Sequence, residues 1–200
     1  MCIRDSLTVG TILVLTGLVG TFGTEALAGF GIGSRVEFLM IPLIFGIGTA
    51  MTSIVGANIG AKNIERAETV GIYGGSLAGI VSVFIGLTLA LFPDLWIQYF
   101  TDDPKASAVT TMYIQLVGPF YVFQGIGLSL YFASQGANAM KWPTIATIAR
   151  FLIASIGGSI AIYWLGLGIE SIFLSSSIAM MVFGLTIFIS IKRGAWRKNS

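Results

Sequence analysis

The stretch TVGIYGGSLAGIVSVFIGLTLALF, from Thr69 to Phe92, decides the fold because it runs without a single charged side chain. A membrane-spanning helix needs about 20 predominantly apolar residues, and this stretch supplies them. Ala106–Met140 and Ser171–Ile191 are equally free of charge. The strands of a membrane barrel would instead alternate in polarity over segments of about 10 residues. The pattern therefore predicts an all-α, polytopic transmembrane helical bundle.

The composition of the whole chain supports the same class. Of its 200 residues, 55% are hydrophobic and only 10% are charged, with a mean hydropathy of +0.89. A water-soluble domain of this composition would have an apolar surface on every side, so a bilayer must act as its solvent. About six membrane-spanning helices are predicted, at residues 7–22, 27–60, 69–92, 106–133, 142–165 and 171–191.

The two ends of the chain differ from these spans. The opening MCIRDS, residues 1–6, does not lead into the first apolar run as a signal sequence would, and we interpret it as a non-native leader, with the true protein continuing upstream of Leu7. Residues 192–200 carry four cations directly after the last span. Such a cluster is the usual topological anchor on the inner side of a membrane, so we predict a basic cytoplasmic tail and no nucleic-acid binding.

The charges between the spans sort into two groups. One group holds Lys62, Arg66, Lys141 and the basic C-terminal residues; the other holds Glu25, Asp94, Asp102, Asp103 and Glu170, with Lys105 as its cation. The positive-inside rule places the first group in the cytoplasm. We therefore expect a multi-pass protein of the cell inner membrane with both ends of this chain cytoplasmic.

The scarcity of reactive side chains excludes several kinds of chemistry. Cys2 is the one thiol, and the chain contains no histidine. Disulfides, zinc sites and histidine-based catalytic triads are thus excluded, and no pair of acids falls within one predicted span. The sequence predicts neither an enzyme nor a metal site.

Glycine and proline inside the spans suggest helices that approach closely and bend. Glycines recur at four-residue spacing as Gly29 and Gly33, as Gly56 and Gly60, and as Gly71, Gly75 and Gly79. Such spacing lets helix backbones touch, and tight packing in a static bundle explains each case taken singly. Pro42 and Pro119, however, each remove a backbone hydrogen bond within a span, so kinks are predicted there. Bending helices suit a transporter better than a scaffold.

Several motifs carry a more specific signal. The second span contains EALAGFGIGSR (25–35), GIGTA (46–50) and VGANIGAK (55–62), and a later stretch combines Gly118-Pro119 and Gln124 with QGANA (135–139). These stretches resemble the multidrug and toxic compound extrusion (MATE) family, at its eighth helix with the following cytoplasmic loop and at its tenth helix. The resemblance covers nearly everything from Leu7 onward.

The resemblance implies a twelve-helix antiporter of two six-helix lobes, with this chain, over residues 7–191, as the C-terminal lobe. Such antiporters export small amphipathic, often cationic compounds in exchange for protons or sodium ions. The expected partners are then these substrates, the lipid bilayer and the missing N-terminal lobe. No cofactor is expected beyond the coupling ion, H⁺ or Na⁺.

Charged side chains within a span are functional candidates because placing one near the bilayer centre costs at least about 2.5 kcal/mol on insertion scales. Arg35, Glu37 and, less strongly, Arg150 qualify, although each can instead snorkel to the interface. The neutral polar candidates for a substrate or cation cleft are Asn58, Gln115, Tyr121 and Gln124. For these, interhelical hydrogen bonding is the alternative explanation.

The resemblance places Gln124 where some MATE branches have an acid, and an amide cannot carry a transported proton. We therefore expect the coupling carboxylate in the N-terminal lobe, with Glu37 as the exception if it faces the cleft. A lipid-linked oligosaccharide or lipid-precursor flippase of the same superfamily is the main alternative. That function calls for several cations around the cavity to hold phosphates.

Overall fold

The computed structural model describes residues 2–197, and every regular element among them is helical. The elements are α1 (Cys2–Gly20), α2 (Thr24–Gly60), α3 (Ile64–Leu91), α4 (Asp94–Ile97), α5 (Pro104–Val117), η1 (Gly118–Phe120), α6 (Tyr121–Gly136), α7 (Lys141–Leu152), η2 (Ile153–Gly157), α8 (Gly158–Tyr163) and α9 (Glu170–Lys192). Within the described chain, five helical segments are long and apolar enough to cross a membrane, and Asp5–Gly20 forms a shorter apolar helix. The predicted all-α membrane bundle is confirmed.

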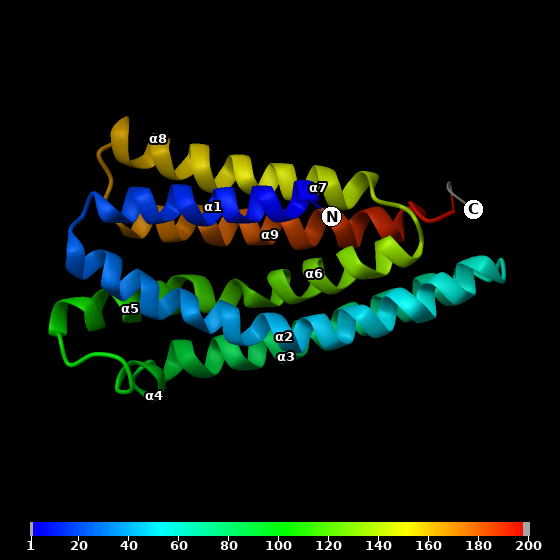
Figure 1. Cartoon of the computed structure of the whole chain (residues 1–200), viewed down its shortest axis with the longest axis horizontal. Helices are drawn as coiled ribbons and strands as arrows, with labels where there is room; N and C mark the ends of the chain where they lie inside the picture. Colours follow the sequence, from blue (N-terminus) through cyan, green and yellow to red (C-terminus); the bar gives the residue numbers. More distant parts are fainter. Residues whose placement is uncertain (1, 198–200) are drawn as a thin grey trace.

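The helices form two groups that meet along α6. In Figure 1, α2, α3 and the α5–α6 segment run side by side, while α1, α7–α8 and α9 form the second group. Helix α6 joins the groups because it packs against α2 and α3 and also against α9. The turns after α2 and α6 lie at the same end of the bundle as the C-terminal residues of α9. The structure thus gathers Lys62, Arg66, Lys141 and Lys192 at one end, which we call the basic end.

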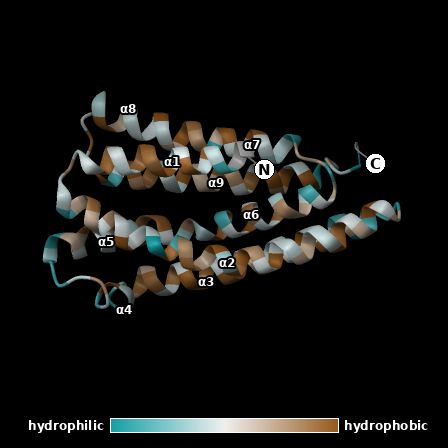
Figure 2. Ribbon diagram, in the orientation of Figure 1, coloured by the Kyte–Doolittle hydropathy of each residue, from teal (hydrophilic) through white to brown (hydrophobic). Residues whose placement is uncertain are grey.

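The outer surface suits contact with lipid. Figure 2 shows hydrophobic and neutral residues along the lengths of the helices, with hydrophilic residues concentrated in the turns. Helix α3 is the clearest case, because Phe84 and Leu91 are each 72% exposed in the isolated chain. Large apolar side chains in such positions avoid water only when hydrocarbon surrounds them.

The observed helix bounds differ from the predicted ones at several places. Helix α1 begins at Cys2, so residues 2–6 of the predicted leader continue the first helix, while Met1 lies outside the described residues. Helix α3 begins at Ile64, earlier than predicted, because Asn63 caps it by accepting a hydrogen bond from the Arg66 N–H. Residues 198–200 of the predicted basic tail also lie outside the described residues.

The two mid-span prolines have different effects on the helices. Between α5 and α6 the chain tightens into the 3₁₀ turn η1, which contains Pro119, a residue with no N–H to donate to the preceding turn. Pro42 is the middle residue of α2, which remains helical throughout and changes direction about halfway along its length in Figure 1. A third irregularity, the π-helical turn η2, widens the helix between α7 and α8.

Helix backbones meet where α6 and its neighbours carry glycine. A Cβ atom on Gly125 would lie 2.6 Å from the Ala78 carbonyl oxygen of α3, and one on Gly136 would strike the backbone of Thr52 in α2. Gly86 and Gly118 oppose each other in the same way. We call these four glycines the backbone seam. Close approach of this kind replaces the hydrophobic driving force that helices lack inside a membrane.

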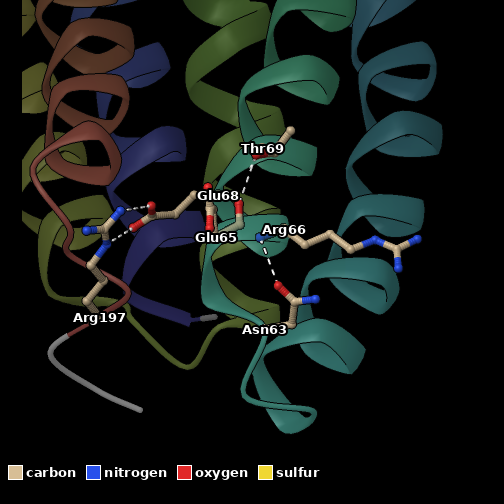
Figure 3. Close-up of polar contacts among 6 residues, drawn as sticks. All are labelled: Asn63, Glu65, Arg66, Glu68, Thr69 and Arg197. Atoms are coloured by element: carbon tan, nitrogen blue, oxygen red, sulfur yellow. Dashed lines mark hydrogen bonds and ion pairs between the residues drawn. The ribbon is translucent and has the colours of Figure 1, made fainter.

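The residues after α9 fold back onto the basic end. Gly194 has φ 77°, a left-handed conformation that turns the chain and brings Trp196 into the core against Gly71. The Trp196 indole donates to the Ser134 hydroxyl, and Arg197 makes two hydrogen bonds to the Glu68 carboxylate, at 3.0 and 2.6 Å (Figure 3). The turn thereby ties α9 to both α3 and α6.

Candidate functional site

A polar cavity of about 80 Å³ lies inside the bundle, between α1, α2, α5, α6, α7 and α9. Apolar side chains form much of its wall, but a small set of polar groups converges on it. These are Thr8 and Thr11 of α1, Ser34 and Glu37 of α2, Tyr113 of α5, Gln124 of α6, Arg150 of α7 and Ser176 of α9. We refer to this set as the polar cavity.

Glu37 is the carboxylate of the polar cavity. It lies 13 residues after the start of α2 at Thr24, which corresponds to roughly 20 Å along the helix axis, well inside a hydrocarbon layer of about 30 Å. The Tyr113 hydroxyl donates a hydrogen bond to Glu37 Oε1, and Tyr113 itself is 2% exposed. Phe30 and Phe173 pack their rings against Tyr113 and fix its orientation.

Arg150 approaches the same cavity from the opposite end of the bundle. It lies nine residues after Lys141, at the start of α7, or about 14 Å along the axis. Its Nη1 donates to Gln124 Oε1 at 2.8 Å, and its guanidinium group lies 5.5 Å from the centre of the Phe183 ring. Glu37 and Arg150 line the same cavity. The bundle therefore places opposite charges at mid-depth, each with one neutral polar partner.

A second cavity adjoins the first at Arg150. Thr8, Gln124 and Arg150 line both cavities, and Asp5 of α1 lines the second one. The guanidinium group thus lies between a cavity that contains Glu37 and one that contains Asp5. Asp5 belongs to the predicted leader, whose status as native sequence stays a prediction.

The structure places some of the predicted cleft residues at the polar cavity and others away from it. Glu37 and Gln124 line the polar cavity together. Tyr121 is completely buried nearby at the start of α6, and its hydroxyl has no hydrogen-bond partner among residues 2–197. Arg35, Asn58 and Gln115 do not line the cavity.

The three remaining candidates each have a local explanation. Arg35 is exposed, with its guanidinium group 5.2 Å from the centre of the Phe100 ring in the loop after α4. Residues two apart on an α-helix point in nearly opposite directions, so Arg35 and Glu37 cannot share one face of α2. The Asn58 amide donates to the Ile54 carbonyl one turn earlier at 2.7 Å, and Gln115 is exposed on α5.

The prediction of site residues missed Tyr113 and gave Arg150 less weight than Arg35. Tyr113 is one of six tyrosines, and only the three-dimensional contact with Glu37 distinguishes it from an ordinary core residue. Arg150 had a usable signal, because it is the one charged residue between Trp142 and Leu165. A charge in such a span needs a partner inside the bundle, and Gln124 supplies it.

The site can change its charge at one interior group in particular. A carboxylate can take up a proton, whereas the Gln124 amide cannot, and an arginine guanidinium remains charged at any physiological pH. Protonation of Glu37 would leave Arg150 as the uncompensated charge of the polar cavity. Because charges in a low-dielectric interior interact strongly, such a step would favour rearrangement of the helices that carry them.

Comparison with known proteins gives consistent matches over nearly the whole chain. The MatE family model matches residues 1–161. The chain is 28% identical over 191 residues to the probable multidrug resistance protein NorM of Thermotoga maritima, covering 94% of this chain and 41% of that protein. It is 25% identical over 194 residues to the probable multidrug resistance protein YpnP of Bacillus subtilis, covering 94% and 42% respectively. The chain therefore spans about two fifths of the length of these curated relatives.

Solved structures share the fold. The crystal structure of the Vibrio cholerae MATE transporter VcmN in the bent form superimposes with a TM-score of 0.85 at 20% identity. The match covers 97% of this chain and 44% of that transporter. The bundle described above thus has the architecture of somewhat less than half of such a transporter.

Proposed function

Because this chain belongs to the MatE family, we propose that it forms one lobe of a secondary active antiporter that exports amphipathic drugs or other xenobiotics across the cell inner membrane. The names of its multidrug resistance relatives support the substrate class. A second lobe, related to this one and facing it across a central cleft, would complete the transporter, and rocking of the two lobes would provide alternating access. The gathering of cations at the basic end supports a cytoplasmic location for that end.

The observation that carries the proposal is the position of Glu37 in the polar cavity, which Arg150 also lines. An ionisable group at this depth is costly and is a functional candidate by default. We propose that Glu37 contributes to coupling in this lobe by binding and releasing a proton.

We favour protons over sodium ions at this site. A bound sodium ion would need several oxygen ligands, and the oxygen of Gln124 already accepts a hydrogen bond from Arg150. The guanidinium group would also repel a second cation placed beside it. Arg150 can therefore act as a tethered cation that balances Glu37 when the carboxylate is ionised.

The lipid-precursor flippase has less support from this site. Binding a phosphate-rich substrate calls for several cavity-facing cations. Of the two predicted intramembrane arginines, Arg150 lines the polar cavity, whereas Arg35 contacts Phe100 outside it.

The test is ethidium efflux from an efflux-deficient host. The reading frame that includes this chain together with its upstream coding sequence would be expressed, and efflux would be driven by an imposed proton or sodium gradient. We expect efflux that follows the proton gradient. Sodium-driven efflux would overturn the choice of ion, and a well-inserted product without gradient-dependent efflux would favour the flippase.

A further inference from the structure

A wide groove in the described part of the chain lies away from the polar cavity, between the start of α7 and the last turns of α9. It encloses about 500 Å³, within the range of roughly 300–1,000 Å³ that is usual for ligand sites. Val182, Leu185 and Ile189 line one side of it along α9. Leu185 and Ile189 are 39% and 42% exposed, so the groove opens to the surface that lipid would cover. The groove thus has an apolar interior open to the bilayer.

The rim of the groove at the basic end is cationic. Arg193 lines the groove immediately after α9, and the Gly194 turn brings Ala195 to the same rim. The ion pairs that the structure describes join Lys105 to Glu25 and Arg197 to Glu68, and neither involves Arg193. An exposed guanidinium group is suited to binding a phosphate through two parallel hydrogen bonds.

Two neighbouring features fit a membrane interface. The Trp142 side chain lines the groove from the first turn of α7, and Lys141 precedes it in the sequence. Tryptophan and lysine are typical of the level of the lipid headgroups. Lys192 lies beside Arg193 in the sequence, with its ammonium group 4.8 Å from the centre of the Phe188 ring. The groove therefore has an apolar interior that suits a lipid acyl chain and a cationic rim at the level of the lipid headgroups.

We propose that this groove binds an anionic phospholipid, with an acyl chain along α9 and the phosphate at Arg193. Charge complementarity selects the lipid class, because basic pockets between transmembrane helices bind anionic headgroups. Zwitterionic lipids would gain the apolar contacts without the net charge attraction. The proposal does not depend on coupling by Glu37, since binding here requires no transport.

The experiment is a fluorescence titration of the purified complete transporter that contains this chain, in detergent, with dibrominated phosphatidylglycerol or dibrominated phosphatidylcholine. Bromine quenches a nearby tryptophan, and the difference between the unchanged chain and Trp142→Phe isolates the signal of Trp142. We expect saturable quenching of Trp142 by phosphatidylglycerol and weaker binding of phosphatidylcholine. Arg193→Gln should weaken phosphatidylglycerol binding about fivefold, because one cation near the headgroup contributes about 1 kcal/mol.

Arg66→Gln is the matched control for charge. Arg66 lies at the same basic end, and Figure 3 shows its side chain extending away from the Glu68–Arg197 pair. The substitution should leave binding unchanged. Equal losses in Arg66→Gln and Arg193→Gln would overturn the proposal, since general surface charge would then explain the selectivity.

Ile189→Phe tests the groove itself without adding a tryptophan. Filling the groove should abolish saturable quenching, whereas Ile178→Phe, on the same helix at 47% exposure but outside the groove, should not. Unchanged binding in Ile189→Phe, or equal quenching by the two lipids, would overturn the proposal. Failure of the efflux test would leave all of these outcomes unaffected.

Discussion

The backbone seam brings helix backbones together at glycine, whereas the polar cavity holds charged side chains between helices. At the seam, Gly125 and Gly136 remove side chains so that α3 and α2 can touch α6 directly. In the cavity, Glu37 and Arg150 keep charged side chains that the membrane interior penalises. The backbone seam stabilises the bundle through close helix contact. The polar cavity lowers the stability of the bundle, because it holds ionisable groups whose protonation can change. Substitutions in the backbone seam and in the polar cavity are therefore expected to change thermal stability by different amounts.

Arg150→Leu is expected to have the largest effect on stability, because it leaves the Glu37 carboxylate without a compensating charge. Removing one partner of a fully buried ion pair costs about 3–5 kcal/mol, and because Glu37 and Arg150 are each only half-buried and not in direct contact we expect about 3 kcal/mol. For a chain of this size the thermal midpoint in detergent should fall by roughly 6–12 °C.

The double variant Glu37→Gln/Arg150→Leu sharpens this result. It removes both charges, so we expect it to regain most of the lost stability, which would reveal the coupling between the two sites. Arg35→Leu serves as the control for loss of an arginine outside the cavity. If the double variant were less stable than Arg150→Leu, the account of the cavity as a balanced pair would be wrong.

Gly136→Ala should have the next largest effect, because its Cβ would strike the backbone of Thr52 and separate α6 from α2. Overpacking of this kind costs about 1–3 kcal/mol. Gly60→Ala is the matched control, since the added Cβ would meet no other element of the structure within 4 Å. Thermal stability followed by size-exclusion chromatography would compare the two, and equal midpoints would contradict the importance of the seam.

Tyr113→Phe should have a smaller effect, because it removes one hydrogen bond to Glu37 and keeps the ring that packs on Phe30 and Phe173. Hydrogen bonds between membrane helices contribute about 0.6 kcal/mol on average and up to about 1.7. A thermal melt of Tyr113→Phe beside Glu37→Gln/Tyr113→Phe would separate this contact from general packing. If Tyr113→Phe lowered the thermal midpoint more than Arg150→Leu does, the predicted ranking of these two variants would be wrong.

Arg197→Gln should change stability least. The Glu68 carboxylate hydrogen-bonds Arg197 and attracts it, which raises the pKa of the guanidinium group, but Arg197 remains largely exposed at the basic end. Water and salt screen such a pair. Thermal melts at low and high salt should differ little between Arg197→Gln and the unchanged chain. A drop as large as that of Gly136→Ala would show that the turn after α9 contributes more than expected.

The helical fold was predictable because long apolar runs leave few alternatives in a membrane. The predicted spans missed two details with physical causes. The π-helical turn at Ile153–Gly157 contains no proline to mark it, and its widening depends on packing against neighbouring helices. The short helix α4, Asp94–Ile97, lies in a loop where a span-length pattern carries no information.

Close approach of helices at glycine was partly predictable from glycine spacing, although the four glycines of the backbone seam were not among the predicted repeats. Gly29, Gly33, Gly75 and Gly79 do approach neighbouring helices, whereas Gly71 meets Trp196 beyond α9 and Gly60 meets open space. Spacing shows that glycines share one helical face but does not show which helix covers that face. The partners on α6, such as Gly125 and Gly136, follow no four-residue repeat with one another, so only the structure identifies them.

The polar cavity was less predictable because it depends on the direction of single side chains. Arg35 and Glu37 lie at similar depths in the predicted span. Because they point in nearly opposite directions from α2, Arg35 contacts Phe100 and Glu37 lines the polar cavity. Tyr113 and Arg150 come from helices far apart in the sequence, and tertiary packing alone brings them to Glu37 and Gln124.

The most direct test of the account is the number of protons exchanged per ethidium molecule in proteoliposomes containing the complete transporter. We compare Glu37→Gln with Glu170→Gln, which removes an exposed carboxylate at the start of α9. The account predicts that Glu37→Gln lowers the proton count or abolishes coupled efflux, while Glu170→Gln behaves like the unchanged protein. An unaltered proton count and efflux rate in well-inserted Glu37→Gln would contradict the coupling role of the polar cavity.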